Sequence, residues 1–412
     1  KTKTIHNFEI DMGDTPYFVT LDEALDICKK TTFQNSVDTV HLDFAHNRIL
    51  ATDLKSLVDD PPFDNSAMDG FAMRHKDTLN PPTNLKIIGT IQASGDQENI
   101  TVSEGETVRI MTGAPMPSGA DSILQVELTS CSGETLTISQ ESMPGYVRKK
   151  GENIRKGDTI LSKGTVLTPS NISMVATMGY NKIPVFRKLV IGIIPTGNEL
   201  RQPGEDLQPG EIFESNAYGI SGLVKWLGHT PKRYDLVEDT MDKTRESLDR
   251  ASKECDLIIT SGGVSMGDWD LIRKIMEEEG DIHFWRIKLR PGSPPLFGKW
   301  KDTPIFGLPG NPVSSHIVFR MLVAPWVRNL TNSFEPVESR AFATLATNVK
   351  PSKDFLTLRR VKIESDGNQL KAYQETHQGS GNIASMALSN ALAMLKPNTD
   401  YSIGDIVEIL YI

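Results

Sequence analysis

The stretch from residue 188 to residue 330 constrains the fold most, because short apolar runs and amphipathic helical patterns alternate along it. The pattern predicts strands at 189–194, 232–237, 257–259, 282–289 and 305–308, and helices at 216–227, 241–254 and 313–328. Such alternation is typical of a doubly wound parallel sheet with helices on both faces. Ligands of these sheets bind beyond the carboxyl ends of the strands, so we expect the loops after Ile194, Ile259 and Leu308 to meet at one edge.

A glycine-rich turn follows the central strand of this stretch. The apolar run 257–259 leads through Gly262 and Gly263 to a helical pattern that Asp268 opens. Backbone amides in such a turn can approach a phosphate, and the helix dipole favours its charge. The segment Gly263–Gly267 also matches the G-x-S-x-G nucleophile elbow of α/β-hydrolases. A third interpretation is a tight connection that needs glycine for its backbone angles.

The rest of the chain disfavours a hydrolase or a nucleotide-binding domain with a known signature. A nucleophilic Ser265 would need an acid and then a histidine on later strands, but Asp281 and His283 are too close together for that arrangement. The P-loop signature is absent. The segment Gly379–Ala384 fits a dinucleotide-binding fingerprint, but too little chain follows it to complete a βαβ unit. An anion site and a structural turn therefore remain.

The chain on either side of this α/β stretch has a different character. Short β-rich runs separated by turn residues fill much of 51–146 and predict a small all-β module inserted into the first segment. Capped helices are expected at 20–30 and from Thr168 to Gly179, in the segments that flank the insertion. From residue 331 onward, alternation and a hairpin turn predict a compact β domain.

Composition excludes several classes of protein. A chain of 412 residues is too long for one core. The net charge of −9 argues against sequence-independent nucleic-acid binding, which needs a basic surface. The three cysteines are far apart and indicate neither a disulfide framework nor a zinc site. No apolar run has the length of a membrane span and no signal peptide is recognisable, so a cytoplasmic location is expected.

Charged residues near the strand ends suggest a site for anions and a metal. Carboxylates from separate loops would suit Mg²⁺, which takes carboxylate, phosphate and water oxygens; the candidates are Asp64, Glu199, Asp256 and Asp268. Alternation in the strand 282–289 and the turn after it would present Arg290 to a phosphate or oxyanion, with a solvated strand edge as the alternative. Arg359 and Arg360 supply further positive charge.

Five motifs occur in order along nearly the whole chain: Phe63–Gly70, Met111–Pro115, Pro195–Leu200, Thr260–Asp268 and Gly307–Ser314. With them the chain resembles the molybdopterin molybdenumtransferases, the family of MoeA and the gephyrin E domain. The resemblance implies an enzyme of molybdenum cofactor biosynthesis, which takes adenylylated molybdopterin and molybdate. It would insert molybdenum into the dithiolene and release AMP, assisted by Mg²⁺. It also implies a homodimer and, as a further partner, the adenylyltransferase of the preceding step.

The same resemblance implies an α/β multidomain fold with four parts. These are a discontinuous elongated α+β domain (1–50 and 147–187), an inserted β-rich domain (51–146), a doubly wound parallel-sheet domain of the molybdopterin-binding type (188–330) and a C-terminal β-barrel (331–412).

The family's residue roles transfer position by position. The catalytic set would be Asp64, Thr112, Glu199 and Asp256, with Glu199 and Asp256 also on the metal. Asp64 and Thr112 would close over the cleft of the partner subunit. The pterin phosphate or pyrophosphate would lie on Ser261, Gly262, Gly263, Ser265, Gly267, Asp268, Pro309, Gly310 and Asn311. Molybdate would bind Arg290, Arg359, Ser380 and Ser385.

Two departures from the family pattern affect the molybdate pocket. Where the family often has Lys-Pro-Gly-Lys-Pro, this chain has Arg290–Pro294, with one cation replaced and another missing. The family's later arginine matches either Arg359 or Arg360, and molybdate and tungstate both remain candidates. A catalytically silent scaffold is an alternative that the retained acids disfavour. The adenylyltransferase itself is another, disfavoured by the additional domains.

Overall fold

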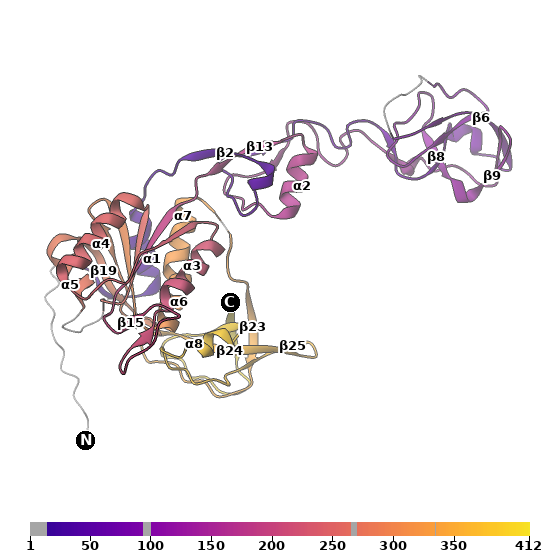
Figure 1. Ribbon diagram of the computed structural model, residues 1–412. Helices are drawn as coiled ribbons and strands as arrows, with labels where there is room; N and C mark the ends of the chain where they lie inside the picture. The colour runs from indigo at the N-terminus through magenta and orange to yellow at the C-terminus, as the bar shows by residue number, and fades with distance from the viewer. Residues whose placement is uncertain (1–14, 94–99, 265–269, 334) are drawn as a thin grey trace.

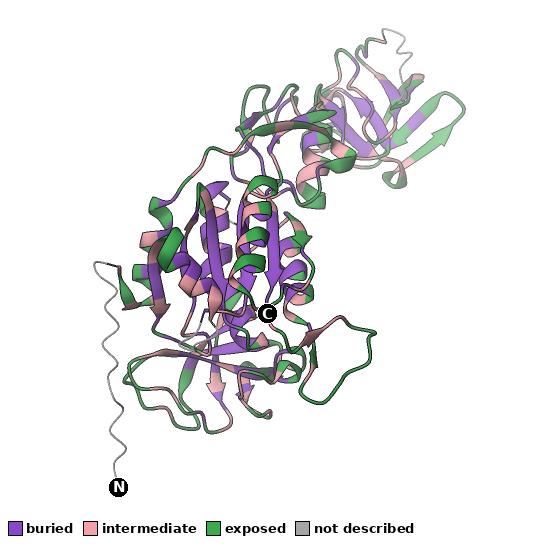
Figure 2. Cartoon of the chain, turned by 60° about the vertical axis from the view of Figure 1, so that its left-hand side comes forward, coloured by how far each residue is buried: buried purple, intermediate pink, exposed green. Residues whose placement is uncertain are grey.

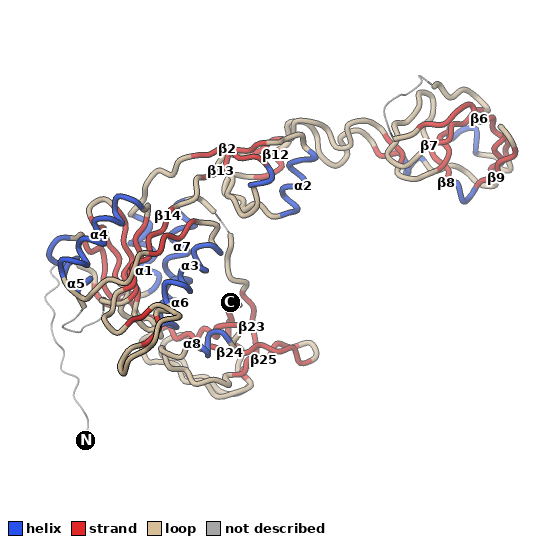
Figure 3. The backbone as a smooth tube through the Cα atoms, in the orientation of Figure 1, coloured by secondary structure: helices blue, strands red, loops and turns tan. Residues whose placement is uncertain are grey.

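The computed structural model describes residues 15–93, 100–264, 270–333 and 335–412. The molecule is elongated: an α/β domain and a β-barrel lie together at one end, and a narrow arm leads to a separate β domain at the other (Figure 1). The chain runs out along this arm and returns beside itself (Figure 3). The multidomain fold class predicted from the sequence is confirmed.

The α/β domain is built on a seven-stranded sheet in the order β1-β19-β21-β22-β18-β14-β17. The strands are β1 (Tyr17–Val19), β14 (Val190–Pro195), β17 (Thr230–Arg233), β18 (Leu257–Ser261), β19 (Asp281–Ile287), β21 (Leu296–Trp300) and β22 (Thr303–Leu308). Strands β17, β14, β18 and β22 are parallel neighbours. The central strands are buried on both faces, which explains their continuous apolar runs (Figure 2).

Helices cover both faces of this sheet. They are α1 (Leu21–Lys30), α3 (Asn216–Trp226), α4 (Met241–Glu254), α5 (Leu271–Glu279), α6 (Pro312–Val318) and α7 (Ala324–Leu330). One core joins α1, α3, α6 and α7 to the sheet, and a second core joins α4 and α5 to it. The single helix expected at 313–328 is interrupted by a π-helical turn, Phe319–Val323, which separates α6 from α7.

The sheet differs from the sequence expectation in two ways. Strand β21 runs antiparallel to both β19 and β22, because 296–308 forms a hairpin instead of a βα unit. Strand β1 pairs with β19, and α1 buries Ala24 and Cys28 in the α/β core, although 1–50 was assigned to the discontinuous domain. Trp326 of α7 donates to the carbonyl of Cys28 at 2.9 Å. An amphipathic pattern shows that α1 has an apolar face, but not which domain buries it.

The arm consists of short antiparallel pairs and one helix. The pairs are β2 (Val37–His41) with β13 (Lys182–Phe186), β3 (Leu54–Lys55) with β12 (Thr159–Leu161), and β4 (Asn65–Ser66) with β11 (Val147–Arg148). The helix is α2 (Pro169–Thr177), which begins after a capping box formed by Thr168 and Asn171. Segments from both sides of the insertion therefore build one arm.

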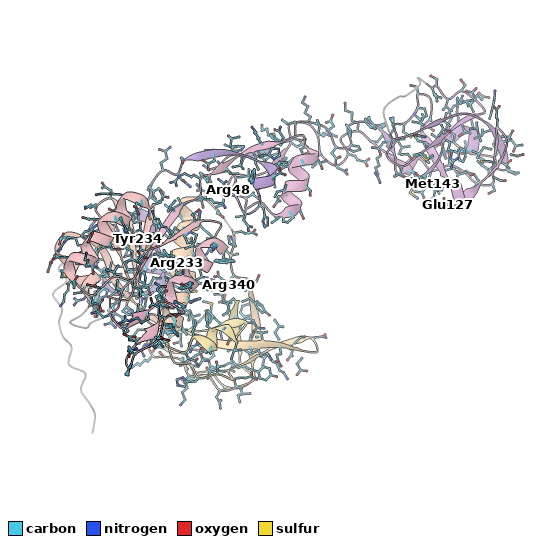
Figure 4. The ribbon with its side chains drawn as sticks, viewed as in Figure 1. Arg48, Glu127, Met143, Arg233, Tyr234 and Arg340 are labelled. Atoms are coloured by element: carbon cyan, nitrogen blue, oxygen red, sulfur yellow. The ribbon has the colours of Figure 1, made fainter. Side chains whose placement is uncertain are left out.

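The inserted domain at the end of the arm is a six-stranded sheet in the order β8-β5-β7-β6-β10-β9. Its strands are β5 (Gly70–Met73), β6 (Thr83–Ile91), β7 (Glu106–Ile110), β8 (Ser122–Gln125), β9 (Thr129–Ser132) and β10 (Thr135–Ile138). Glu127 and Met143 mark this domain in Figure 4, far from Arg233 and Tyr234 of the α/β domain.

The C-terminal domain is a closed barrel, because β24 pairs with both β25 and β26. Its elements are β20 (Leu289–Arg290), β23 (Arg340–Leu345), β24 (Leu356–Asp366), β25 (Gln369–Tyr373), α8 (Ile383–Ala387), β26 (Ala391–Leu395) and β27 (Ile406–Tyr411). Helix α8 contacts α6, which brings the barrel against the α/β domain. In the part of the chain that the structure describes, no helix has the length and apolar character needed to cross a bilayer.

Candidate functional site

Three loops meet at the carboxyl edge of the α/β sheet, as the sequence predicted. Pro195 lies beside Ser261 in the strand register, and Ser261 lies beside Leu308, so β14, β18 and β22 end side by side. A cleft of about 650 Å³ opens at this edge. Predicted site residues that line it are Glu199, Ser261, Gly262, Gly263, Pro309, Gly310 and Asn311.

Three of the residues that line the cleft are glycines, Gly262, Gly263 and Gly310, and we call this part of the lining the floor of the cleft. Gly263 has a φ of +70°, and a Cβ placed on it would lie 2.9 Å from Cγ1 of Ile272 in α5. No other residue fits there without strain. The amide of Gly262 donates to the carbonyl of Leu308 at 3.0 Å, so the turn after β18 and the end of β22 are joined through their backbones. The floor is therefore side-chain-free, which allows a ligand to approach the backbone closely.

Four acidic residues line the cleft, Glu199, Glu214, Asp239 and Asp270, and two of them, Glu199 and Asp239, lie in the loops after β14 and β17. A Cβ on Gly197 would lie 2.8 Å from both carboxylate oxygens of Glu199, so this carboxylate folds back over the turn. Asp239, in the loop before α4, accepts the amide hydrogen of Asn198 at 3.1 Å, and Asn198 accepts that of Asp239 at 3.0 Å. Asp239 belongs to none of the five motifs and was not predicted. Because ligands of such sheets bind beyond the carboxyl ends of the strands, the loop after β17 was also a place to look for site residues such as Asp239.

Polar groups at the start of α3 complete this side of the cleft. Glu214 is buried, and one of its carboxylate oxygens accepts the amide hydrogen of Ala217 at 2.6 Å. Burial raises the pKa of Glu214 despite this bond. Asn216 donates from Nδ2 to the hydroxyl of Ser261 and to the carbonyl of Gly310, each at 2.7 Å. Neither residue was predicted, because both lie beyond the five motifs.

The barrel contributes an arginine behind the cleft. Arg360 has no exposed surface and donates to the hydroxyl of Ser385 at 3.0 Å and to the carbonyl of Gly379 at 3.1 Å. Burial, followed by the charge of Arg359, lowers the pKa of Arg360 to about 10. Gly381 and Ile383, which follow Gly379 in the chain, line the cleft. Among the described residues, no carboxylate pairs with Arg360 and its Nη1 has no hydrogen-bond partner.

The other residues predicted for molybdate are more dispersed. Arg359 faces away from Ser385 and donates to the carbonyl of Lys350 at 3.1 Å. The sequence left open whether Arg359 or Arg360 lies in the pocket, and in the structure it is Arg360 that donates to Ser385. Arg290 is exposed and stacks over Phe355, 4.2 Å from the ring centroid. Ser380 accepts the amide hydrogen of Val313 through its backbone carbonyl at 3.1 Å, so it lies beside the start of α6.

Asp256 lies at the opposite edge of the sheet from the cleft. It precedes β18, and its carboxylate binds the Arg187 guanidinium at 2.7 and 3.0 Å and the amide of Val190 at 2.7 Å. The ligand edge is where β18 ends, at Ser261. Asp256 and Glu199 therefore do not converge, and the expected pair of metal-side acids is not formed.

Asp64 and Thr112 lie near the inserted domain, not in the cleft of their own chain. Asp64 pairs with Lys149 at 2.9 Å and accepts the amide hydrogen of Lys150. The hydrogen bond from Lys150 is the first cause of the lowered pKa of Asp64. Thr112 donates its hydroxyl to Asp69 at 2.8 Å. Ser265, Gly267 and Asp268 lie outside the described residues.

The fold and the cleft define an α/β domain with a cleft at the carboxyl edge of its sheet, adjoined by a β-barrel. Family models match three parts of the chain: the MoeA N-terminal region (domain I and II) at 19–179, a probable molybdopterin binding domain at 192–329, and the MoeA C-terminal region (domain IV) at 343–412.

Curated relatives cover nearly the whole chain. It is 33% identical to the molybdopterin molybdenumtransferase of Haemophilus influenzae, over 95% of this chain and 98% of the relative. The Bacillus subtilis protein of the same name is also 33% identical, over 96% of this chain and 94% of the relative. A crystal structure of the MoeA protein from Pyrococcus horikoshii OT3 is similar, with a TM-score of 0.82 and 27% identity over 96% of this chain and 100% of that one. The chain belongs to the molybdopterin molybdenumtransferase (MoeA) family.

Proposed function

We propose that this chain is an enzyme of molybdenum cofactor biosynthesis that inserts molybdenum from molybdate into adenylylated molybdopterin and releases AMP. One observation carries the proposal. The cleft brings the backbone of the glycine turns and the carboxylates of Glu199 and Asp239 next to Gly381 of the barrel, and Arg360 donates to Gly379 in the same loop. A phosphoanhydride and an oxyanion would thus bind next to each other. Placing two reactants together in this way removes much of the entropic barrier to their reaction.

Arg360 is the best candidate for binding molybdate. A buried guanidinium without a carboxylate partner is unfavourable, so the site favours an anion that supplies the missing charge. Its Nη1 is buried without a partner in the described part of the chain, whereas Nε and Nη2 are occupied by Ser385 and Gly379. Ser385 and the turn at Ser380 lie beside it. We therefore transfer the proposed role from Arg359 to Arg360 and keep Ser380, Ser385 and Arg290 in the pocket.

The residues of the cleft fit Mg²⁺ with phosphate as a co-ligand. The described residues include no cluster of three or more acids, histidines or cysteines, which a fully protein-bound metal would need. Mg²⁺ requires only one or two carboxylates when phosphate and water supply the other oxygens. Glu199 and Asp239 both line the cleft and would hold it. When bound, Mg²⁺ would screen the charge of the phosphates, while Asp256 has no part in this site.

A homodimer would explain where Asp64 and Thr112 lie. The arm carries both residues away from the cleft of their own chain, so a second copy would have to supply the cleft that they close (Figure 1). Large apolar side chains are exposed along the arm and its end, as expected of a surface that another subunit covers: Val37, Phe44, Leu57, Val58 and Phe63. The adenylyltransferase of the preceding step would deliver the substrate. The three cysteines, all free, suit a reducing, cytoplasmic location.

AMP release from purified adenylylated molybdopterin tests the proposal. With Mg²⁺ and molybdate, the wild-type chain should release AMP, and Glu199→Gln should lose most of this activity. Glu205→Gln is the control, since Glu205 is exposed and does not line the cleft. No molybdate-dependent release by the wild type, with the substrate still bound, would refute the enzyme and leave a binding or scaffold protein.

A further inference from the structure

The side chain of Asn216 links two loops of the cleft. Asn216 is the first residue of α3, and its Nδ2 lies 2.7 Å from the hydroxyl of Ser261 and 2.7 Å from the carbonyl of Gly310. Ser261 ends β18, and Gly310 follows β22. One amide group therefore holds together the two loops whose glycines form the floor of the cleft.

The carbonyl of Gly310 settles which way the amide of Asn216 points. A backbone carbonyl can only accept a hydrogen bond, so the atom that faces it must be the NH₂ group. The opposite atom, Oδ1, is buried and has no partner among the described residues. The contact with Gly310 thus makes Asn216 a donor toward Ser261 as well.

The orientation of the Asn216 amide determines whether the hydroxyl of Ser261 donates or accepts a hydrogen bond toward the cleft. Because Asn216 donates to Oγ of Ser261, the hydroxyl hydrogen of Ser261 must point elsewhere. Within the described ranges, no protein group accepts that hydrogen, although Ser261 is only 3% exposed. Ser261 lines the cleft, so an acceptor from a ligand can take this place. A hydroxyl bound to a charged oxygen forms a stronger hydrogen bond than one bound to a neutral acceptor.

We propose that Asn216 is a positioning residue that makes Ser261 a hydrogen-bond donor to a phosphoryl oxygen of the bound substrate. The inference rests on the proposed function for the identity of that substrate, adenylylated molybdopterin with its phosphoanhydride. Asn216 also lines the cleft, but its Nδ2 is taken up by Ser261 and Gly310 and its Oδ1 is buried, so its side chain offers the ligand no polar group. It acts by fixing the rotamer and the polarity of Ser261, and by holding the Gly310 loop against the loop that contains Gly262.

Binding of AMP to single and double variants tests this role. Asn216→Ala removes both hydrogen bonds without adding charge, and Ser261→Ala removes the donor. Each should weaken AMP binding about 10-fold, the loss expected for one charge-assisted hydrogen bond. The double variant should bind AMP about as weakly as either single variant, because both changes remove the same interaction. Asn216→Asp should bind more weakly still, since its carboxylate would accept the Ser261 hydrogen.

A matched control separates this role from general stability. Asn35 also donates from Nδ2 to a backbone carbonyl, that of Arg187, and its Oδ1 is also buried without a partner in the described residues. It lies at the base of the arm, so Asn35→Ala should leave AMP affinity unchanged. Unfolding midpoints followed by tryptophan fluorescence would be measured for every variant.

The outcomes distinguish the inference from the proposed function. Additive losses in the double variant, or a lowered unfolding midpoint with unchanged AMP affinity, would overturn the role of Asn216. Inorganic pyrophosphate serves as a second probe. Binding of pyrophosphate but not AMP, with the same coupling between Asn216 and Ser261, would support the positioning role and refute the nucleotide. A wild-type chain that binds neither would refute both.

Discussion

Asp256→Asn discriminates between two roles of Asp256: a metal ligand, as the motifs suggest, and a structural partner of Arg187, as the structure supports. The carboxylate makes two charge-assisted hydrogen bonds to Arg187 and one to the amide of Val190, all between 2.7 and 3.0 Å. Arg187 also donates to Ser36 at 3.1 Å. The ion pair therefore stabilises the place where the arm joins the α/β domain, next to the ends of β2 and β13.

The expected cost of Asp256→Asn is about 2 kcal/mol of unfolding free energy. Hydrogen bonds to charged groups contribute about 1.5–3 kcal/mol, whereas exposed ion pairs contribute about 0–1 kcal/mol. The side chains of Arg187 and Asp256 are 35% and 22% exposed, which places this pair between the two classes. The hydrogen bond with Asp256 is also the first cause of the raised pKa of Arg187.

Urea unfolding followed by tryptophan fluorescence suits this test. All five tryptophans lie between residues 226 and 326, so the signal comes from the α/β domain. Asp256→Asn should lower the midpoint without changing the Mg²⁺ dependence of AMP release. Asp242→Asn is the control, because its carboxylate is 96% exposed and its pairing with Arg245 should contribute little. An unchanged midpoint together with a large loss of Mg²⁺-dependent activity would show that the reasoning is wrong and that Asp256 acts on the metal.

Three further predictions concern separate parts of the molecule. Arg360→Gln should raise the molybdate concentration needed for AMP release at least 10-fold, whereas Arg359→Gln should change it little; equal effects in titrations of both variants would contradict the assignment. Burial lowers the pKa of His229 and of His316 to about 4, below the ordinary 6.5. Only the unfolded chain then takes up protons between these values, so stability falls as the pH drops from 7 to 5, by about 2 kcal/mol for each histidine. His229→Gln should make the unfolding free energy, measured in urea, depend less on pH. An unchanged pH dependence would contradict the role given to His229. Gly263→Ala should destabilise the fold by about 1–3 kcal/mol because of its φ of +70° and the nearby Ile272, and calorimetry showing a higher melting temperature would exclude this strain.

Features with a local physical cause could be predicted well from the sequence. Thr20 and Glu23 form the expected capping box at the start of α1, and α4 spans the expected 241–254. The apolar runs located β14, β18 and β22, and the strand-end rule then located the cleft. Each of these inferences depends on neighbouring residues or on a general rule of sheet topology.

Features that depend on distant partners could not be predicted. Asp256 resembles a site residue until Arg187, 69 positions away, is seen to bind it. Arg359 and Arg360 alternate along β24, and only the strand register shows which of them faces Ser385. A shift of one residue would exchange their faces, so the sequence alone left both open. The addition of β1 and α1 to the α/β domain likewise rests on long-range packing.

If one cleft couples cleavage of the phosphoanhydride to insertion of molybdenum, the two reactions must proceed together. The most direct test measures both products of the wild-type chain, AMP and protein-bound or released molybdenum–molybdopterin, in the same reaction with Mg²⁺ and limiting molybdate. We expect equal amounts of AMP and inserted molybdenum throughout the time course. AMP release that continues unchanged without molybdate, or molybdenum insertion without AMP release, would contradict the claim.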